Sequence, residues 1–274
     1  MRVPDEIRKT VGFVAYIDQT SGESVPVGSF FFFGHDANDG QKFSPKMYVV
    51  TARHVIEKLR QRGVLAVELR LNTKGGANQF VTKSVPIGDW YFHPSDASID
   101  VAVFEMGIPV DADHLVIPFS MSANSDKLKQ HEVELGDEVF VSGLFRHHYG
   151  KKRNIPIVRV GTLAALNEEK IATEIGEMDA YLIEARSIGG LSGSPVFLNL
   201  GVVRFIGGQV KHAKDPVFFL LGLIHGHFDV KSTAGVSSPE SVSVATSESI
   251  NSGIAIVVPI ESVRAVIAAY ESRA

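Results

Sequence analysis

The chain has 274 residues, enough for one large or two small domains, and its 45% hydrophobic and 21% charged residues are typical of a soluble globular protein. Its formal net charge of −4 gives no basic surface for nucleic acid or an anionic membrane, so we expect neither partner. The absence of cysteine excludes disulfides, thiolate metal ligands and cysteine nucleophiles.

The N-terminal residues Met1 to Lys9 lack the apolar core of a signal peptide. The longest apolar run, Val217 to Ile224, is too short to span a bilayer. We therefore expect a cytoplasmic protein, and secretion after removal of a leader is left open.

Short runs of β-branched and aromatic residues predict strands throughout the first half of the chain. These runs cover residues 11–17, 27–34, 47–52, 65–71, 80–87 and 101–106. Residues 53–59 fit a short helical turn after the third run. Residues 118–134 are polar and poorly patterned, which makes them the best candidate for a linker. A first β-barrel domain is therefore expected over residues 1–120.

A second set of strands is predicted after this linker. It covers residues 138–143, 155–161, 180–185, 195–198, 202–210, 218–224 and 254–258. Residues 229–253 are serine-rich and lack periodicity, which is typical of an exposed loop. Pro259 can open a helix in which Val263, Val266, Ile267 and Tyr270 share one face. The pattern predicts an all-β fold with two β-barrels, the second over residues 121–274, closed by a C-terminal α-helix.

One loop has the composition that a nucleophilic serine needs. Residues 189–197 read Gly-Gly-Leu-Ser-Gly-Ser-Pro-Val-Phe, so small residues surround Ser192 and an apolar run follows. The glycines allow a tight turn in which two backbone N–H groups face one point, and they leave room for a substrate carbonyl. Glycine-serine turns are common, so this loop is strong evidence only beside a base and a carboxylate.

His54 and Asp100 provide that base and that carboxylate. His54 lies just past a buried strand that ends at Ala52, and Asp100 comes immediately before a strand that begins at Val101. Strand ends are where a scaffold presents polar side chains to a cleft. Taken singly, each is more often structural: a satisfied histidine, a turn or cap aspartate, or a loop serine. Together, the three residues favour a catalytic triad.

With these motifs the chain resembles the chymotrypsin-like (trypsin-fold) serine peptidase family. Thr-Ala-x-His ending at His54, Asp-x-Ala starting at Asp100 and Gly-x-Ser-Gly-x-Pro around Ser192 match its three motifs, in the family's chain order. The likeness covers about residues 11–270. It implies two six-stranded Greek-key β-barrels with a C-terminal α-helix, and a serine endopeptidase that acts on polypeptides without a cofactor.

The resemblance also implies a role for each site residue. Ser192 would attack the scissile carbonyl to form an acyl-enzyme, and His54 would take its proton and later protonate the leaving amine. Asp100 would hold the imidazole tautomer and stabilise the imidazolium. The backbone N–H groups of Gly190 and Ser192 would form the oxyanion hole.

The sequence departs from the family's zymogens just before the serine. Those enzymes carry an aspartate there, which pairs with a freed N-terminal amine and shapes the oxyanion hole, whereas this chain has Leu191. No cleavage-dependent N-terminus is therefore implied. Either the hole forms unaided or an unknown activating partner orders it. The Ser-Gly-Ser-Pro sequence that begins at Ser192 is similar to bacterial glutamyl endopeptidases and related non-animal members.

The same resemblance places Arg186, His225 and Gly253 in the walls of the primary substrate pocket. Arg186 and His225 are potentially cationic and would favour an acidic side chain before the scissile bond. The alternative is that Arg186 points to solvent or pairs with Glu184, and that His225 is an ordinary strand residue.

Two histidine pairs, His147-His148 and His225 with His227, invite a metal interpretation. Neither pair has a matched third ligand at helical spacing, and a strand places His225 and His227 on one face without any metal. No metal site is therefore expected.

Two other functions fit the same residues. One is a peptidase-fold binding or sensor module with little or no turnover, which Leu191 favours because it leaves the order of the oxyanion hole open. The other is an esterase-like hydrolase that uses Ser192 on small acyl substrates.

Overall fold

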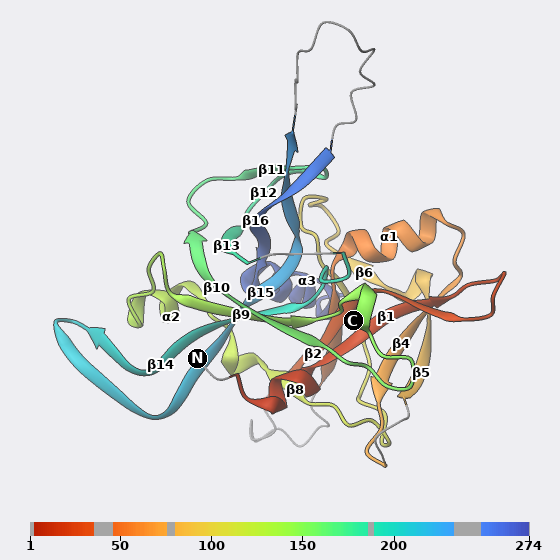
Figure 1. Cartoon of the computed structure of the whole chain (residues 1–274), viewed down its shortest axis with the longest axis horizontal. Coiled ribbons are helices and arrows are strands. Elements are labelled where there is room, and N and C mark those ends of the chain that lie inside the picture. The colour runs from red at the N-terminus through yellow and green to blue at the C-terminus, as the bar shows by residue number, and fades with distance from the viewer. Residues whose placement is uncertain (1–2, 36–45, 76–79, 186–188, 233–247, 274) are drawn as a thin grey trace, which may run out of the picture.

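The computed structural model describes residues 3–35, 46–75, 80–185, 189–232 and 248–273. About half of these residues lie in strands, which form two β-structures side by side (Figure 1). None of the helices within these ranges is long and apolar enough to span a bilayer.

The first half of the chain forms an eight-stranded sheet with the order β5-β4-β1-β2-β3-β7-β6, in which β8 pairs parallel to β2. Its strands are β1 (Val11–Ile17), β2 (Ser24–Gly34), β3 (Met47–Thr51), β4 (Ala66–Asn72), β5 (Phe80–Pro86), β6 (Tyr91–Phe92), β7 (Ala102–Glu105) and β8 (Val116–Pro118). Three short helices accompany it: η1 (Asp5–Thr10), α1 (Arg53–Gln61) and η2 (Ile87–Asp89).

The second half forms a closed six-stranded barrel with the order β10-β13-β16-β15-β14-β9. Its strands are β9 (Glu138–Gly143), β10 (Ile157–Ala165), β13 (Tyr181–Glu184), β14 (Pro195–Ile206), β15 (Gln209–Ser232) and β16 (Glu248–Pro259). A separate hairpin joins β11 (Ile171–Thr173) to β12 (Gly176–Met178). The remaining helices are η3 (Phe119–Met121), α2 (Ser125–Gln130), η4 (Arg146–His148) and α3 (Ile260–Glu271).

The chymotrypsin-like double-barrel fold and its terminal helix are confirmed, with a difference in the first half. Its sheet has eight strands rather than six, and its ladder does not close on itself within the described residues. Its strands end at Pro118 and those of the barrel begin at Glu138. The division into domains 1–120 and 121–274 stays a prediction.

The stretch predicted as a linker contains two short helices, η3 and α2. The side chain of Asn124 accepts a hydrogen bond from the backbone N–H of Lys127, and this cap begins α2 in a polar sequence.

Both ends of the serine-rich segment 229–253 lie in strands. Residues 229–232 continue β15 and residues 248–253 begin β16, because the two strands pair with each other across this distance. The prediction of a loop is wrong for these residues, and residues 233–247 lie outside the described part of the chain.

One apolar core joins the two halves. The run Phe30 to Phe33 on β2 is fully buried, so this part of the strand is covered on both faces. The same cluster includes Phe140 and Phe197 from the barrel and Val263 from α3. The terminal helix therefore packs on both halves and holds the barrel against the first sheet.

His114 is a titratable group inside this core. Its ring stacks on Phe30 and meets Phe32 edge to face, with centroids 6.1 and 5.0 Å apart. Burial lowers the pKa of His114 to about 3, although Asp113 and the Thr10 backbone act in the opposite direction.

The lowered pKa of His114 makes stability depend on pH. The folded chain binds fewer protons than the unfolded chain between pH 6.5 and about 3, so the free energy of unfolding should fall as the pH falls through this window. His114→Phe keeps an aromatic ring but cannot titrate. Urea denaturation across this range should give a smaller pH slope for this variant than for the wild type or for the exposed control His147→Phe. Equal slopes would contradict the prediction.

Candidate active site

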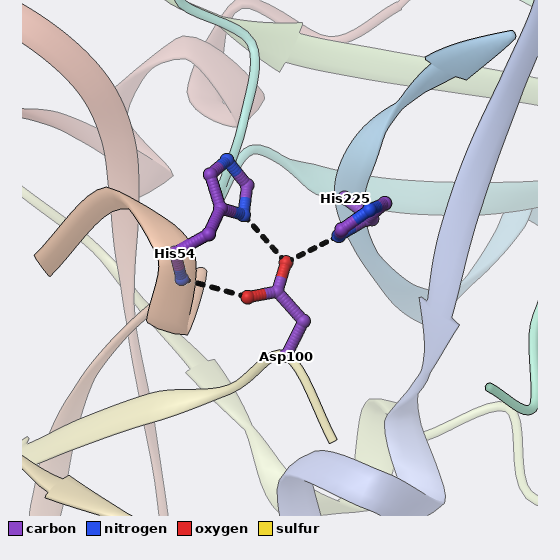
Figure 2. Close-up of side chains that lie close together, drawn as sticks. All are labelled: His54, Asp100 and His225. Atoms are coloured by element: carbon purple, nitrogen blue, oxygen red, sulfur yellow. Dashed lines mark hydrogen bonds and ion pairs between the residues drawn. The ribbon is translucent and has the colours of Figure 1, made fainter. Parts of the chain in front are cut away.

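The carboxylate of Asp100 is the centre of the site. It lies just before β7, is fully buried, and accepts two hydrogen bonds from His54 (Figure 2). The backbone N–H of His54 donates to Oδ1 at 2.8 Å, and Nδ1 donates to Oδ2 at 2.7 Å. His54 is in the first turn of α1, where backbone N–H groups have no partner within the helix. One buried carboxylate thus fixes both the start of α1 and the imidazole.

A third donor reaches the same carboxylate from the barrel. Nδ1 of His225 lies 2.5 Å from Oδ2 of Asp100 (Figure 2). The His225 ring meets the His54 ring nearly at right angles, with centroids 5.2 Å apart. The two halves of the molecule are therefore joined through Asp100.

A β-bulge in β15 turns the His225 side chain towards Asp100. Along β15, Ile224 pairs with Val257 and Gly226 pairs with Ile256 of β16, which leaves His225 as an extra residue. A bulge interrupts the alternation of side chains between the two faces of a sheet and re-aims one of them. Simple alternation along the strand, on which the sequence interpretation relied, therefore gave no sign of the contact with Asp100.

Burial alone would raise the pKa of Asp100. The two imidazoles beside it outweigh this effect through charge and hydrogen bonding, and they hold the pKa below its usual value. Asp100 is therefore ionised at neutral pH and acts only as an acceptor. Both Nδ1 atoms must then carry a proton, so that in the neutral rings the Nε2 atoms of His54 and His225 are the acceptors.

Backbone hydrogen bonds fix the loop that carries Ser192, between β13 and β14. Gly193 N donates to Ile224 O at 2.8 Å, Ser194 N donates to Leu191 O at 2.8 Å, and Ile224 N donates to Ser194 O at 2.9 Å. The loop is thus tied both to itself and to the strand that carries His225.

Gly193 is required by this packing. It has a φ of +80°, and a Cβ there would lie 2.2 Å from the carbonyl oxygen of Ser29 and 2.4 Å from Oγ1 of Thr51. Glycine alone allows the serine loop to approach the first sheet this closely.

The Ser192 hydroxyl donates a hydrogen bond to the backbone carbonyl of His225 at 3.2 Å. Among the described residues, no hydrogen bond joins Ser192 to His54. The carboxylate thus holds the His54 ring, while the serine hydroxyl is turned to another acceptor.

Ser192, His54 and His225 line one cavity of about 430 Å³. Its wall also includes Lys58 from α1, Phe228 from β15, and Glu174 and Ile175 at the turn between β11 and β12. The sequence interpretation missed the β11–β12 hairpin, because its two strands have three residues each and too short a pattern to detect.

His54, Asp100 and His225 each place a potential metal-ligand atom within 4.8 Å of the others. Both Nδ1 atoms, however, are only 2.5 and 2.7 Å from Asp100 Oδ2. Ligands of a tetrahedral zinc ion at about 2.0–2.1 Å from the metal would be about 3.3 Å apart. The observed spacing is that of hydrogen bonds.

The remaining predicted residues have different outcomes. Gly190 is buried, has a φ of +109°, and precedes Leu191, whose side chain is buried in the barrel core. Gly253 lies on β16 and is not among the described residues that line the cavity. Arg186 lies outside the described residues. The pocket roles of Arg186, His225 and Gly253 stay predictions.

No protein-family model matches the sequence, and no curated protein matches it. Solved structures do match the fold. The MamO protease domain from Magnetospirillum magneticum aligns with a TM-score of 0.52 and 15% identity, over 95% of this chain and 96% of that one. Deg5 aligns with a TM-score of 0.50 and 17% identity, over 94% of this chain and 87% of that one.

The chain has the trypsin-like serine protease fold. At these identities the likeness establishes the fold alone, and the relation to glutamyl endopeptidases stays a prediction.

Within this trypsin-like fold, replacing Asp100 tests the electrostatic account of the site. The lowered pKa of Asp100 means that its stabilising contribution is fully present above about pH 3.8 and is lost as the pH falls towards the lowered value. Asp100→Asn should therefore be less stable than the wild type at pH 7, because hydrogen bonds to a charged group are worth about 1.5–3 kcal/mol each. Urea denaturation from pH 7 to pH 3 should show that the difference in free energy of unfolding between the wild type and Asp100→Asn shrinks below pH 4. A difference that stays constant with pH would contradict this prediction.

Proposed function

We propose that the chain is a serine endopeptidase that hydrolyses peptide bonds through an acyl-enzyme formed on Ser192. The observation that carries the proposal is the buried, ionised Asp100 carboxylate, which holds Nδ1 of His54 while Ser192 lines the same cavity as His54. A serine hydroxyl is a weak nucleophile and needs a neighbouring base whose orientation is fixed.

In the proposed reaction, the side chain of Ser192 rotates from the His225 carbonyl to Nε2 of His54 when a peptide enters the cavity. Nε2 takes the hydroxyl proton as Oγ attacks the carbonyl carbon, and the imidazolium is stabilised by Asp100. The same nitrogen then protonates the leaving amine. Water repeats the sequence on the acyl-enzyme and releases the second product.

The oxyanion that forms at each step needs hydrogen-bond donors that already point at it before the reaction begins. The backbone N–H groups of Gly190 and Ser192 are proposed for this role. Within the described part of the chain neither donates a hydrogen bond to another protein group. Removing one such donor typically lowers kcat by roughly 10²–10³-fold.

We also propose that Arg186, His225 and Gly253 contact the substrate residue before the scissile bond, with a preference for acidic side chains. For His225 only Nε2 would face such a substrate, since Nδ1 is bound to Asp100. The charge of Arg186 is then the main support for this preference.

The alternative function is a peptidase-fold module that binds a polypeptide and turns it over slowly or not at all. The hydrogen bond from Ser192 Oγ to the His225 carbonyl favours it, because a hydroxyl held there is not in contact with its base. Slow turnover would follow if substrate binding did not release this bond.

Turnover of a peptide library by the wild type, Ser192→Ala and His54→Ala distinguishes these functions. We expect cleavage by the wild type, enriched for Asp or Glu before the scissile bond, and a loss of at least about 10⁴-fold in kcat in both variants. Binding of a library peptide without cleavage would contradict the endopeptidase proposal and support the module. Hydrolysis of small esters alone would indicate an esterase.

A further inference from the structure

Ser29 on β2 contacts the serine loop from the opposite half of the molecule. It is fully buried, and its backbone N–H donates to the carbonyl oxygen of Ser192 at 2.9 Å. Its Oγ donates to the carbonyl oxygen of Gly190 at 3.2 Å and accepts from the N–H of Leu144 at 2.8 Å. Its own carbonyl oxygen accepts from Oγ1 of Thr51 at 2.7 Å. Thr51 from the first half and Leu144 from the second half therefore fix Ser29 independently of its contacts with the serine loop.

These contacts bracket the peptide that carries the N–H of Ser192. Each peptide unit is planar, so holding the Gly190 carbonyl fixes the unit between Gly190 and Leu191. Holding the Ser192 carbonyl likewise fixes the unit between Ser192 and Gly193. The peptide unit between Leu191 and Ser192, which presents one of the proposed oxyanion donors, lies between the two fixed units. Its orientation is thus set from both sides by one residue of the first sheet.

The backbone of Gly190 is the part of the loop that needs this restraint. Its φ of +109° is in the left-handed region, where glycine has no Cβ penalty and also little preference of its own. Without a hydrogen-bond donor to its carbonyl oxygen, the peptide after Gly190 could rotate and carry the loop with it. The buried side chain of Leu191 anchors the loop in the barrel core but offers no charge for a salt bridge.

We propose that the Ser29 hydroxyl is a positioning residue that holds the Gly190–Ser192 loop in the conformation of a formed oxyanion hole. This inference rests on the proposed function of Ser192. It adds a reason why the chain needs no freed N-terminal amine: the restraint on the loop is a hydrogen bond from β2, made as soon as the two halves pack together.

The test compares Ser29→Ala with Ser122→Ala in steady-state peptide cleavage. Ser122 is the matched control, because its hydroxyl is also buried and donates to a backbone carbonyl, that of Phe119 at 2.8 Å, outside the site. We expect Ser29→Ala to lower kcat by roughly 10–100-fold with KM within about twofold, since the oxyanion donors act on the transition state. Ser122→Ala should keep both constants.

Ser29→Cys is a second variant in case Ser29→Ala does not fold. A thiol fills a similar volume and is a weak donor, so kcat should fall below that of the wild type, by less than the roughly 10–100-fold expected when the donor is removed altogether. An unchanged kcat in Ser29→Ala or Ser29→Cys, or a raised KM with unchanged kcat, would overturn the positioning role and leave the peptidase proposal standing. Absence of turnover in the folded wild type would instead overturn the proposed function and, with it, this inference.

Discussion

The site depends on the hydrogen bonds that the buried carboxylate of Asp100 accepts. A charge removed from water must be matched by donors, and Asp100 takes them from the backbone and ring of His54 on one side and from the ring of His225 on the other. His54 comes from α1 in the first half of the chain and His225 from the barrel, so the same contact that satisfies the charge also sets the two halves against each other. Both of these histidines line the cavity beside Ser192.

A second set of contacts at the same junction concerns the backbone rather than charge. Gly193 lets the serine loop approach Ser29 and Thr51 closely, and Ser29 in turn holds carbonyl groups on both sides of the Ser192 N–H. In the family's zymogens an ion pair before the serine serves to order this loop. Here the buried Leu191 occupies the position before the serine, and the loop accepts hydrogen bonds from Ser29 of β2.

His54, Asp100 and the glycine-rich Ser192 loop could be identified from the sequence, because each lies at a strand end or in a turn with its own local pattern. The bond between Asp100 and His225 could not, because a β-bulge at His225 breaks the alternation from which side-chain direction is inferred. Ser29 carried no signal either, since one serine among apolar strand residues looks like any other. The strand pattern predicted the two β-structures, and the apolar face after Pro259 predicted α3. The strand segments at 229–232 and 248–253 escaped detection because most of their residues are polar.

The central claim is that Ser192 becomes a nucleophile through His54. Intact-mass analysis after treatment with a fluorophosphonate probe tests it most directly, because the probe bonds only to an activated serine and needs no knowledge of the substrate. The account predicts one adduct per chain on the wild type and none on Ser192→Ala or His54→Ala. No adduct on the folded wild type, or an adduct that persists in Ser192→Ala, would contradict it.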